Sequence, residues 1–169
     1  MSADEFLTAL RSTHARLVSS RPGVEAGAPW PLAERFDHAP EAAWGPPELL
    51  AHVAEMLPFW QGEVEKIVAG PPEPVPFGRV GTDPVRIALI GRDRSLPIAT
   101  LYDRIDRGVG IWEGRLTSLT ADEWAKRGLH PSLGEMTIEA IVRRMLLGHL
   151  AEHAEQLQGI LAGGREARP

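Results

Sequence analysis

Apolar side chains recur every three or four residues along four long segments of the chain, and this spacing constrains the fold more than any other feature. Such spacing places the side chains on one face of an α-helix. We therefore expect amphipathic helices over residues 3–19, 46–69, 96–119 and 137–161. Because polar residues cover their other faces, these helices must pack against one another, which predicts a single-domain, all-α four-helix bundle spanning residues 1–169.

The connections between these helices are rich in proline and glycine, and short extra helices are expected within them. Residues 71–90 combine a proline-rich loop with a helical stretch that begins at Thr82-Asp83-Pro84. Residues 120–126 predict a short capped turn, and Gly163-Gly164 is expected to end the last helix. The sequence shows no β-strand pattern of any length, and the apolar run 86–90 is the one segment that is compatible with a short strand.

The composition excludes several classes of protein. The formal net charge is -5 and there is no cluster of Lys or Arg, so we expect no nucleic-acid partner and no binding to an anionic membrane. The absence of cysteine excludes disulfides, thiolate nucleophiles and Cys-ligated zinc. The N-terminus does not resemble a signal peptide, and no apolar run approaches the roughly 20 residues of a membrane helix. A cytoplasmic protein is therefore expected.

Three of the six histidines fall on predicted apolar helix faces. His149 and His153 are four residues apart, so their imidazoles lie one helical turn apart on the same side. His52 falls among the apolar positions of the helix over 46–69. A buried imidazole without a partner costs about 1–3 kcal/mol, and one divalent ion would satisfy all three. Because three protein ligands leave a fourth position open, the pattern is typical of a catalytic metal site.

A different interpretation stays open for each of these histidines taken alone, since a single histidine on an apolar face is more often a core residue bonded to a carbonyl or carboxylate. The segment His149-Leu-Ala-Glu152-His153 also matches a metalloprotease pattern, H-x-x-E-H, with Glu152 as general base. We reject that fold because only sixteen residues follow His153. Glu152 remains a candidate general base or a group that supports a metal ligand, and the alternative is a solvated surface carboxylate. No Glu has His three residues later, so the sequence does not support a di-iron carboxylate site.

The other three histidines are weaker candidates. His14 lies at the edge of the first apolar face and is expected to pack at the surface or in the core, with support of a metal ligand as the alternative. His38 and His130 are expected in loops, exposed to solvent. His130 precedes the last helix closely enough to be a candidate for the mouth of a pocket.

Three short motifs occur in a distinctive order along the chain. Glu48-Leu-Leu-Ala-His52, near the start of the second long helix, is followed by Trp60. His130-Pro-Ser-Leu-Gly-Glu-Met-Thr137 opens the last helix, which carries His149-Leu-Ala-Glu-His153-Ala-Glu-Gln156. In this order and over nearly the whole chain, the sequence resembles the DinB-like superfamily of damage-inducible four-helix bundles.

The resemblance implies a bundle with up-down-down-up connectivity and a divalent metal, usually zinc or nickel, on three histidines. His52, His149 and His153 match the ligand positions of the family. Some members use bacillithiol or mycothiol as cosubstrate, others are described as metal-dependent hydrolases, and dimers are common. The segment 71–90 departs from the family pattern, so the substrate of a relative cannot be transferred to this chain.

Three hypotheses for function follow. The first is a metal-dependent enzyme of the thiol S-transferase type, in which the metal lowers the pKa of a low-molecular-weight thiol. The second is a metal-dependent hydrolase, in which metal-bound hydroxide attacks a small-molecule substrate and Glu152 assists. The third is a non-catalytic metal or small-molecule binding module that serves in a stress response. The sequence predicts the same three ligands for all of them.

Overall fold

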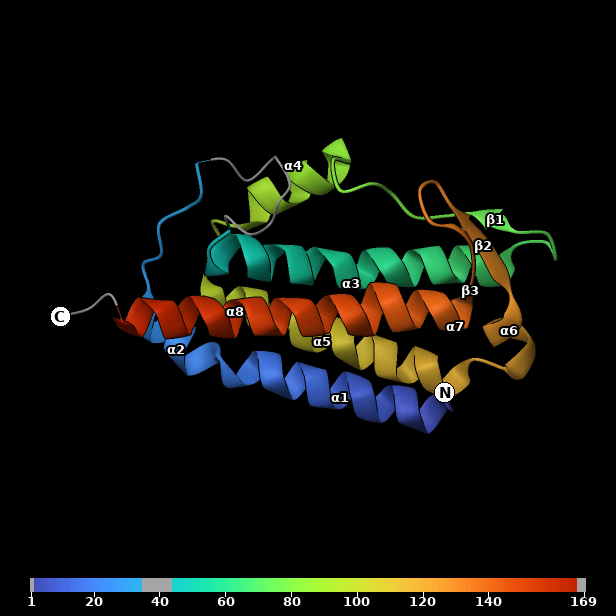
Figure 1. The fold of residues 1–169 in the computed structure, drawn as a ribbon, viewed down its shortest axis with the longest axis horizontal. Coiled ribbons are helices and arrows are strands. Elements are labelled where there is room, and N and C mark those ends of the chain that lie inside the picture. The colour runs from blue at the N-terminus through green and yellow to red at the C-terminus, as the bar shows by residue number, and fades with distance from the viewer. Residues whose placement is uncertain (1, 35–43, 167–169) are drawn as a thin grey trace.

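Four long helices form a bundle in the computed structural model, which describes residues 2–34 and 44–166, with the side chains of the second range given to residue 163 (Figure 1). They are α1 (Ala3–Ser19), α3 (Pro46–Ala69), α5 (Ile98–Ser118) and a composite last helix. The last helix joins α7 (Ile138–Ile141), a π-helical segment (Val142–Gly148) and α8 (His149–Glu166). The prediction of an all-α four-helix bundle is confirmed.

The helices follow the up-down-down-up order that the family resemblance implies. In Figure 1, α1 and the last helix run in one direction, whereas α3 and α5 both run in the other. Because α3 and α5 are parallel and pack against each other, the chain must cross the whole length of the bundle between them. That crossover contains α4 (Pro84–Asp93), which lies against α3.

The helices differ from the prediction in three places. After α1 ends at Ser19, a short helix α2 (Arg21–Gly27) starts at once, because proline is tolerated in the first turn of a helix. The last helix continues through Gly163-Gly164 to Glu166. Glycine inside a helix costs only about 1 kcal/mol relative to alanine, so two glycines do not oblige a helix to end. Helix α4 begins at Pro84, directly after the expected cap at Asp83, and extends to Asp93 rather than ending near Ile90.

A small three-stranded sheet lies beside one end of the bundle, so the expectation of no β-strand was wrong. Its strands are β1 (Val75–Pro76), β2 (Arg127–His130) and β3 (Gly134–Thr137), with β1 parallel and β3 antiparallel to β2. At two to four residues each, the strands are too short to show an alternating pattern in sequence. Residues 86–90 are not a strand, because Asp83 Oδ1 accepts a hydrogen bond from the backbone N–H of Arg86 and caps α4.

Close packing fixes the sheet against α3. A Cβ atom on Gly128 would lie 2.4 Å from Cδ1 of Phe77 and 2.7 Å from Cδ1 of Ile67. Because any larger residue at position 128 would clash, glycine is required for β2 to lie this close to Ile67 of α3 and to Phe77, the residue after β1. The backbone N–H of Phe77 also donates to the carbonyl of Leu129.

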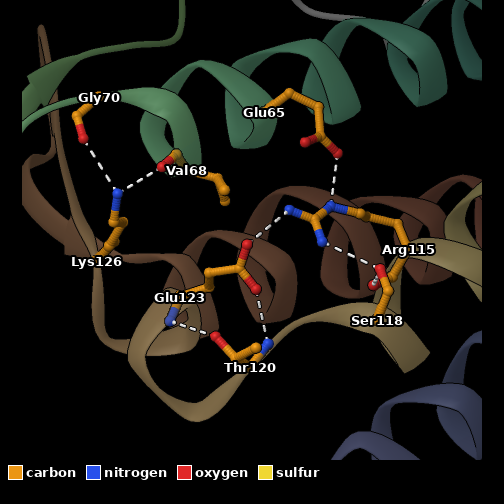
Figure 2. A network of polar contacts seen from close by, with 8 residues as sticks. All are labelled: Glu65, Val68, Gly70, Arg115, Ser118, Thr120, Glu123 and Lys126. Atoms are coloured by element: carbon orange, nitrogen blue, oxygen red, sulfur yellow. Dashed lines mark hydrogen bonds and ion pairs between the residues drawn. The ribbon is translucent and has the colours of Figure 1, made fainter.

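Polar contacts join the same end of α3 to the segment after α5 (Figure 2). Arg115 on α5 donates through Nε to Glu65 on α3 at 2.6 Å. Lys126, just after α6 (Ala121–Ala125), donates to the carbonyl oxygens of Val68 and Gly70 at 2.5 and 3.1 Å. A cation at the carboxyl end of a helix satisfies carbonyls that have no partner within the helix. These contacts hold α6 and the following hairpin to the bundle.

Among the residues that the structure describes, none of the helices combines the length and apolar character needed to cross a membrane.

Candidate metal centre

Helix α3 carries His52 nearly two turns after a buried helix start. The helix opens with Pro46-Pro47, and Glu48 Oε2 accepts a hydrogen bond from the backbone N–H of Gly45 at 3.2 Å. Glu48 Oε1 is 3.1 Å from Nη1 of Arg94, which follows α4, so this fully buried carboxylate also ties the crossover to α3. His52 is itself only 1% exposed, in agreement with its predicted place in the core.

His149 and His153 lie on α8, directly after the π-helical segment. The backbone N–H of His149 donates to the carbonyl of Arg144, five residues earlier, where an α-helix would use the residue four earlier. The sequence predicted one regular α-helix over 137–161. The structure differs from that prediction in the wider, π-helical turns over Val142–Gly148. It accommodates an extra residue, so that both Leu146 and Leu147 are buried before the α-helical spacing resumes at His149.

The three predicted histidines converge on one point of the core. The Nε2 atoms of His52 and His149 are 3.2 Å apart, and one ligand nitrogen from each of the three imidazoles lies within 4.8 Å of the others. Nitrogen ligands at about 2.0–2.1 Å from a tetrahedral ion are about 3.3–3.4 Å apart, so the first pair has the separation that a bound ion requires.

Gln156 supports one of these ligands. Nδ1 of His153 lies 3.2 Å from Oε1 of Gln156, one turn further along α8. Because an amide oxygen only accepts hydrogen bonds, Nδ1 carries the hydrogen and the lone pair is on Nε2. A hydrogen bond of this kind orients an imidazole and makes it a better metal ligand. The donor set and its orientation therefore fit a divalent ion.

Burial favours the neutral form of two of these imidazoles, His149 and His52. Removal from water lowers the pKa of His149 from the usual 6.5 to about 3, and the neighbouring His153 and Arg86 contribute in the same direction. Burial, followed by His153 and Arg86, also lowers the pKa of His52 well below 6.5. A metal binds the neutral form of imidazole, so at neutral pH no proton has to leave before binding.

Arg86 reaches the centre from α4 and was not anticipated from sequence. Its Nη2 lies 3.4 Å from Nε2 of His52, and its Nη1 donates to the carbonyl of Gly81 at 2.9 Å. The guanidinium lies 5.4 Å from the ring of Trp44, which also packs edge-on against His52. Because the crossover follows no periodic pattern, its position relative to α3 could not be read from the sequence.

Glu55 is the carboxylate next to the cluster. Its Oε2 lies 3.9 Å from Nδ1 of His52 and accepts a hydrogen bond from Nη2 of Arg79 at 2.5 Å. The side chain of Glu55 is 6% exposed and that of Arg79 is 10% exposed, so the pair is buried as a unit. The spacing of three residues between His52 and Glu55 was a signal that the sequence contained, since residues i and i+3 share a helix face.

The other candidates lie outside the cluster. Glu152 is exposed on α8, and its role as a base stays a prediction. His14 Nε2 contacts Asp106 Oδ1 at 2.7 Å, in a partly exposed pair between α1 and α5. His38 lies outside the described residues.

His130 is buried, so the expectation of a solvent-exposed loop residue was wrong. It is the last residue of β2, is 5% exposed, and its Nδ1 accepts from the backbone N–H of Ser132. Its ring packs edge-on against Phe77, and burial lowers its pKa. The reason for the difference is that His130 belongs to strand β2 and lies on the buried face of that strand.

The fold and the site together define a class of protein: a four-helix bundle whose core contains a three-histidine cluster that can hold a divalent metal ion. A model of the DinB superfamily matches residues 1–157. The chain therefore belongs to the DinB superfamily, as the order of its motifs predicted. No match was found among curated proteins or among solved structures.

Proposed function

We propose that the chain holds Zn²⁺ or Ni²⁺ on His52, His149 and His153 and acts as a metal-dependent enzyme of the thiol S-transferase type. The observation that carries this proposal is the convergence of three imidazoles from two helices, with one ligand nitrogen of each within 4.8 Å of the others. Three protein ligands leave a coordination position open for substrate, which is the arrangement of catalytic rather than structural zinc.

The residues around the cluster have distinct roles in this proposal. A divalent ion bound there would lower the pKa of a small thiol and so would supply its thiolate at neutral pH, with the thiol proton passing to solvent. Gln156 orients His153 through Nδ1. Arg86, whose guanidinium lies beside Nε2 of His52, donates hydrogen bonds to an anionic group of the substrate. In such a reaction the thiolate sulfur would form a bond to an electrophilic carbon, and the leaving group would depart with the electron pair of the broken bond.

A second candidate function is hydrolysis of a small molecule. It is favoured by Glu55, a buried carboxylate 3.9 Å from Nδ1 of His52, because hydrolysis needs a base close to the attacking water. Glu152, the base suggested by the sequence, is exposed and is the weaker of the two candidates.

Elemental analysis of the purified protein tests the metal site. We expect close to one divalent ion per chain in the wild type and loss of that ion in His52→Ala, His149→Ala and His153→Ala. The matched control is His14→Asn, which removes an imidazole outside the cluster and should keep the ion. Full metal content in the His149→Ala variant would refute the proposed ligands.

An activity assay then separates the two reactions. The metal-loaded protein is incubated with bacillithiol, mycothiol or glutathione and a thiol-reactive bimane, and conjugate formation is followed by fluorescence. Faster conjugation that requires the three histidines supports the transferase. Hydrolysis of ester or amide probes that is lost in Glu55→Gln, without conjugation, supports the hydrolase. Metal binding with neither activity would leave a binding module.

A further inference from the structure

A cavity of about 750 Å³ lies between α3, α4 and α5, and none of the three histidines lines it. This volume falls within the range of about 300–1,000 Å³ that is usual for small-molecule sites. The wall on α3 is formed by Ala54, Glu55, Pro58 and Phe59. The cavity therefore lies next to the candidate metal centre and shares Glu55 with it, but the three histidines are not part of its lining.

The chain creates this cavity by local packing. Gly108 on α5 lies so close to α3 that a Cβ atom there would be 3.0 Å from the side chain of Leu57. This close approach of α5 to α3 closes the cavity at Gly108, which is one of its lining residues. Pro58 has no backbone N–H, so it cannot donate to the carbonyl of Ala54 in the preceding turn. That carbonyl belongs to a residue lining the cavity, and Pro58 itself is exposed there.

The outer wall is apolar. Leu89 from α4 and Ile111 from α5 line the cavity, together with Val85 at the start of α4. Val85 is 62% exposed and Ile111 is 47% exposed. Large apolar side chains exposed around a concave surface are typical of a ligand site.

Two arginines one turn apart on α5 give the cavity a cationic side. Arg104 Nη1 donates to Oδ2 of Asp93 at 2.8 Å, and Arg92 donates to both oxygens of the same carboxylate at 2.7 and 2.9 Å. Asp93 is thus shared between two cations. Arg107 lines the cavity three residues after Arg104, and within residues 2–34 and 44–163 no carboxylate forms an ion pair with it. Like charges at this spacing repel each other, and an anion bound between them relieves the repulsion.

The part of the lining formed by Phe59, Arg79 and Glu55 carries no net charge. The guanidinium of Arg79 lies 3.7 Å from the centre of the Phe59 ring, and its charge is balanced by Glu55 at 2.5 Å. This surface suits an aromatic group, which packs well against a ring and a planar guanidinium.

We propose that this cavity is a second ligand site, which binds a small carboxylate with an aromatic or other apolar body. The carboxylate lies at Arg104 and Arg107, and the apolar body extends over Phe59, Leu89 and Ile111. Because none of the three histidines lines the cavity, binding does not require the metal.

Isothermal titration calorimetry tests this site with 4-phenylbutyrate as the probe and its neutral amide, 4-phenylbutanamide, as the matched ligand. We expect one binding site for the acid, in both the metal-loaded protein and His149→Ala, and binding of the amide about tenfold weaker, because a charge-assisted hydrogen bond is lost.

Variants locate the site. Arg107→Gln should weaken binding of the acid about fivefold and leave the amide unchanged, as expected for a partly exposed ion pair. The control Arg127→Gln has the same change of charge in β2 and should have no effect. Ile111→Trp fills the cavity from an exposed position, so the fold is retained and both ligands are excluded. No saturable binding of the acid by the wild type, or equal binding by the wild type and Ile111→Trp, would overturn the proposal.

Discussion

Acid should destabilise the metal-free protein through its buried imidazoles. In the folded state the pKa of His149 is about 3, whereas an unfolded chain has the ordinary value of 6.5. Below pH 6.5 the unfolded state therefore binds a proton that the folded state does not accept. The resulting stability is fully present above pH 6.5 and is lost progressively as the pH falls toward 3.

The size of this effect follows from the two pKa values. Each unit of difference corresponds to about 1.4 kcal/mol, so moving from pH 7.5 to pH 5.0 costs about 2 kcal/mol from His149 alone. His52 acts in the same direction, since its pKa is also lowered by burial.

Urea unfolding of chelator-treated protein at pH 7.5 and pH 5.0 measures the loss. The variant His149→Gln cannot gain a proton, so its loss of stability between the two pH values should be smaller than that of the wild type by about 2 kcal/mol. Leu157→Val, on the same helix, is the matched control: it lowers stability by about 1 kcal/mol at both pH values alike. The same pH dependence in His149→Gln and the wild type would refute the reasoning.

Two further predictions concern glycines. Gly110→Ala should raise the free energy of unfolding by about 0.5–1 kcal/mol, because a Cβ atom there meets no other atom within 4 Å. Gly108→Ala should be less stable than Gly110→Ala by about 1–3 kcal/mol, owing to its close contact with α3; equal stability in urea unfolding would contradict this. Gly78→Ala should lower the melting temperature, because Gly78 has φ +80° and its Cβ atom would lie 2.3 Å from Cδ2 of His130. Gly81→Ala, with open space around it, is the control for that measurement, and a similar melting temperature for both variants would show the inference to be wrong.

The bundle could be predicted because its long helices carry their packing information in their own sequences. The stripe that contains His149 and His153 identifies both the face that packs in the bundle and two of the three clustered histidines, and His52 is found in the same way on α3. These features depend on the spacing of residues within one helix, which is visible before any tertiary contact is known.

The missed features depend on contacts between distant segments. Arg86 reaches His52 only because the crossover lies against α3, and nothing in residues 71–90 specifies that position. The strands of the hairpin are stabilised by pairing and by packing on Phe77, and four residues alone carry too little pattern to identify them. Glu55 is different, because its spacing from His52 was visible in the sequence and was not used.

The π-helical segment divides the last helix into a part of adjustable length and a part of fixed length. Its wide turns hold an extra residue, so deletion of one residue between Val142 and Gly148 can be absorbed by a return to α-helical hydrogen bonding. The apolar face of α7 and the imidazoles of α8 then keep their places. A deletion between His149 and His153 cannot be absorbed in this way, because that part of the helix is regular α-helix. It would turn one imidazole about 100° around the helix axis relative to the other.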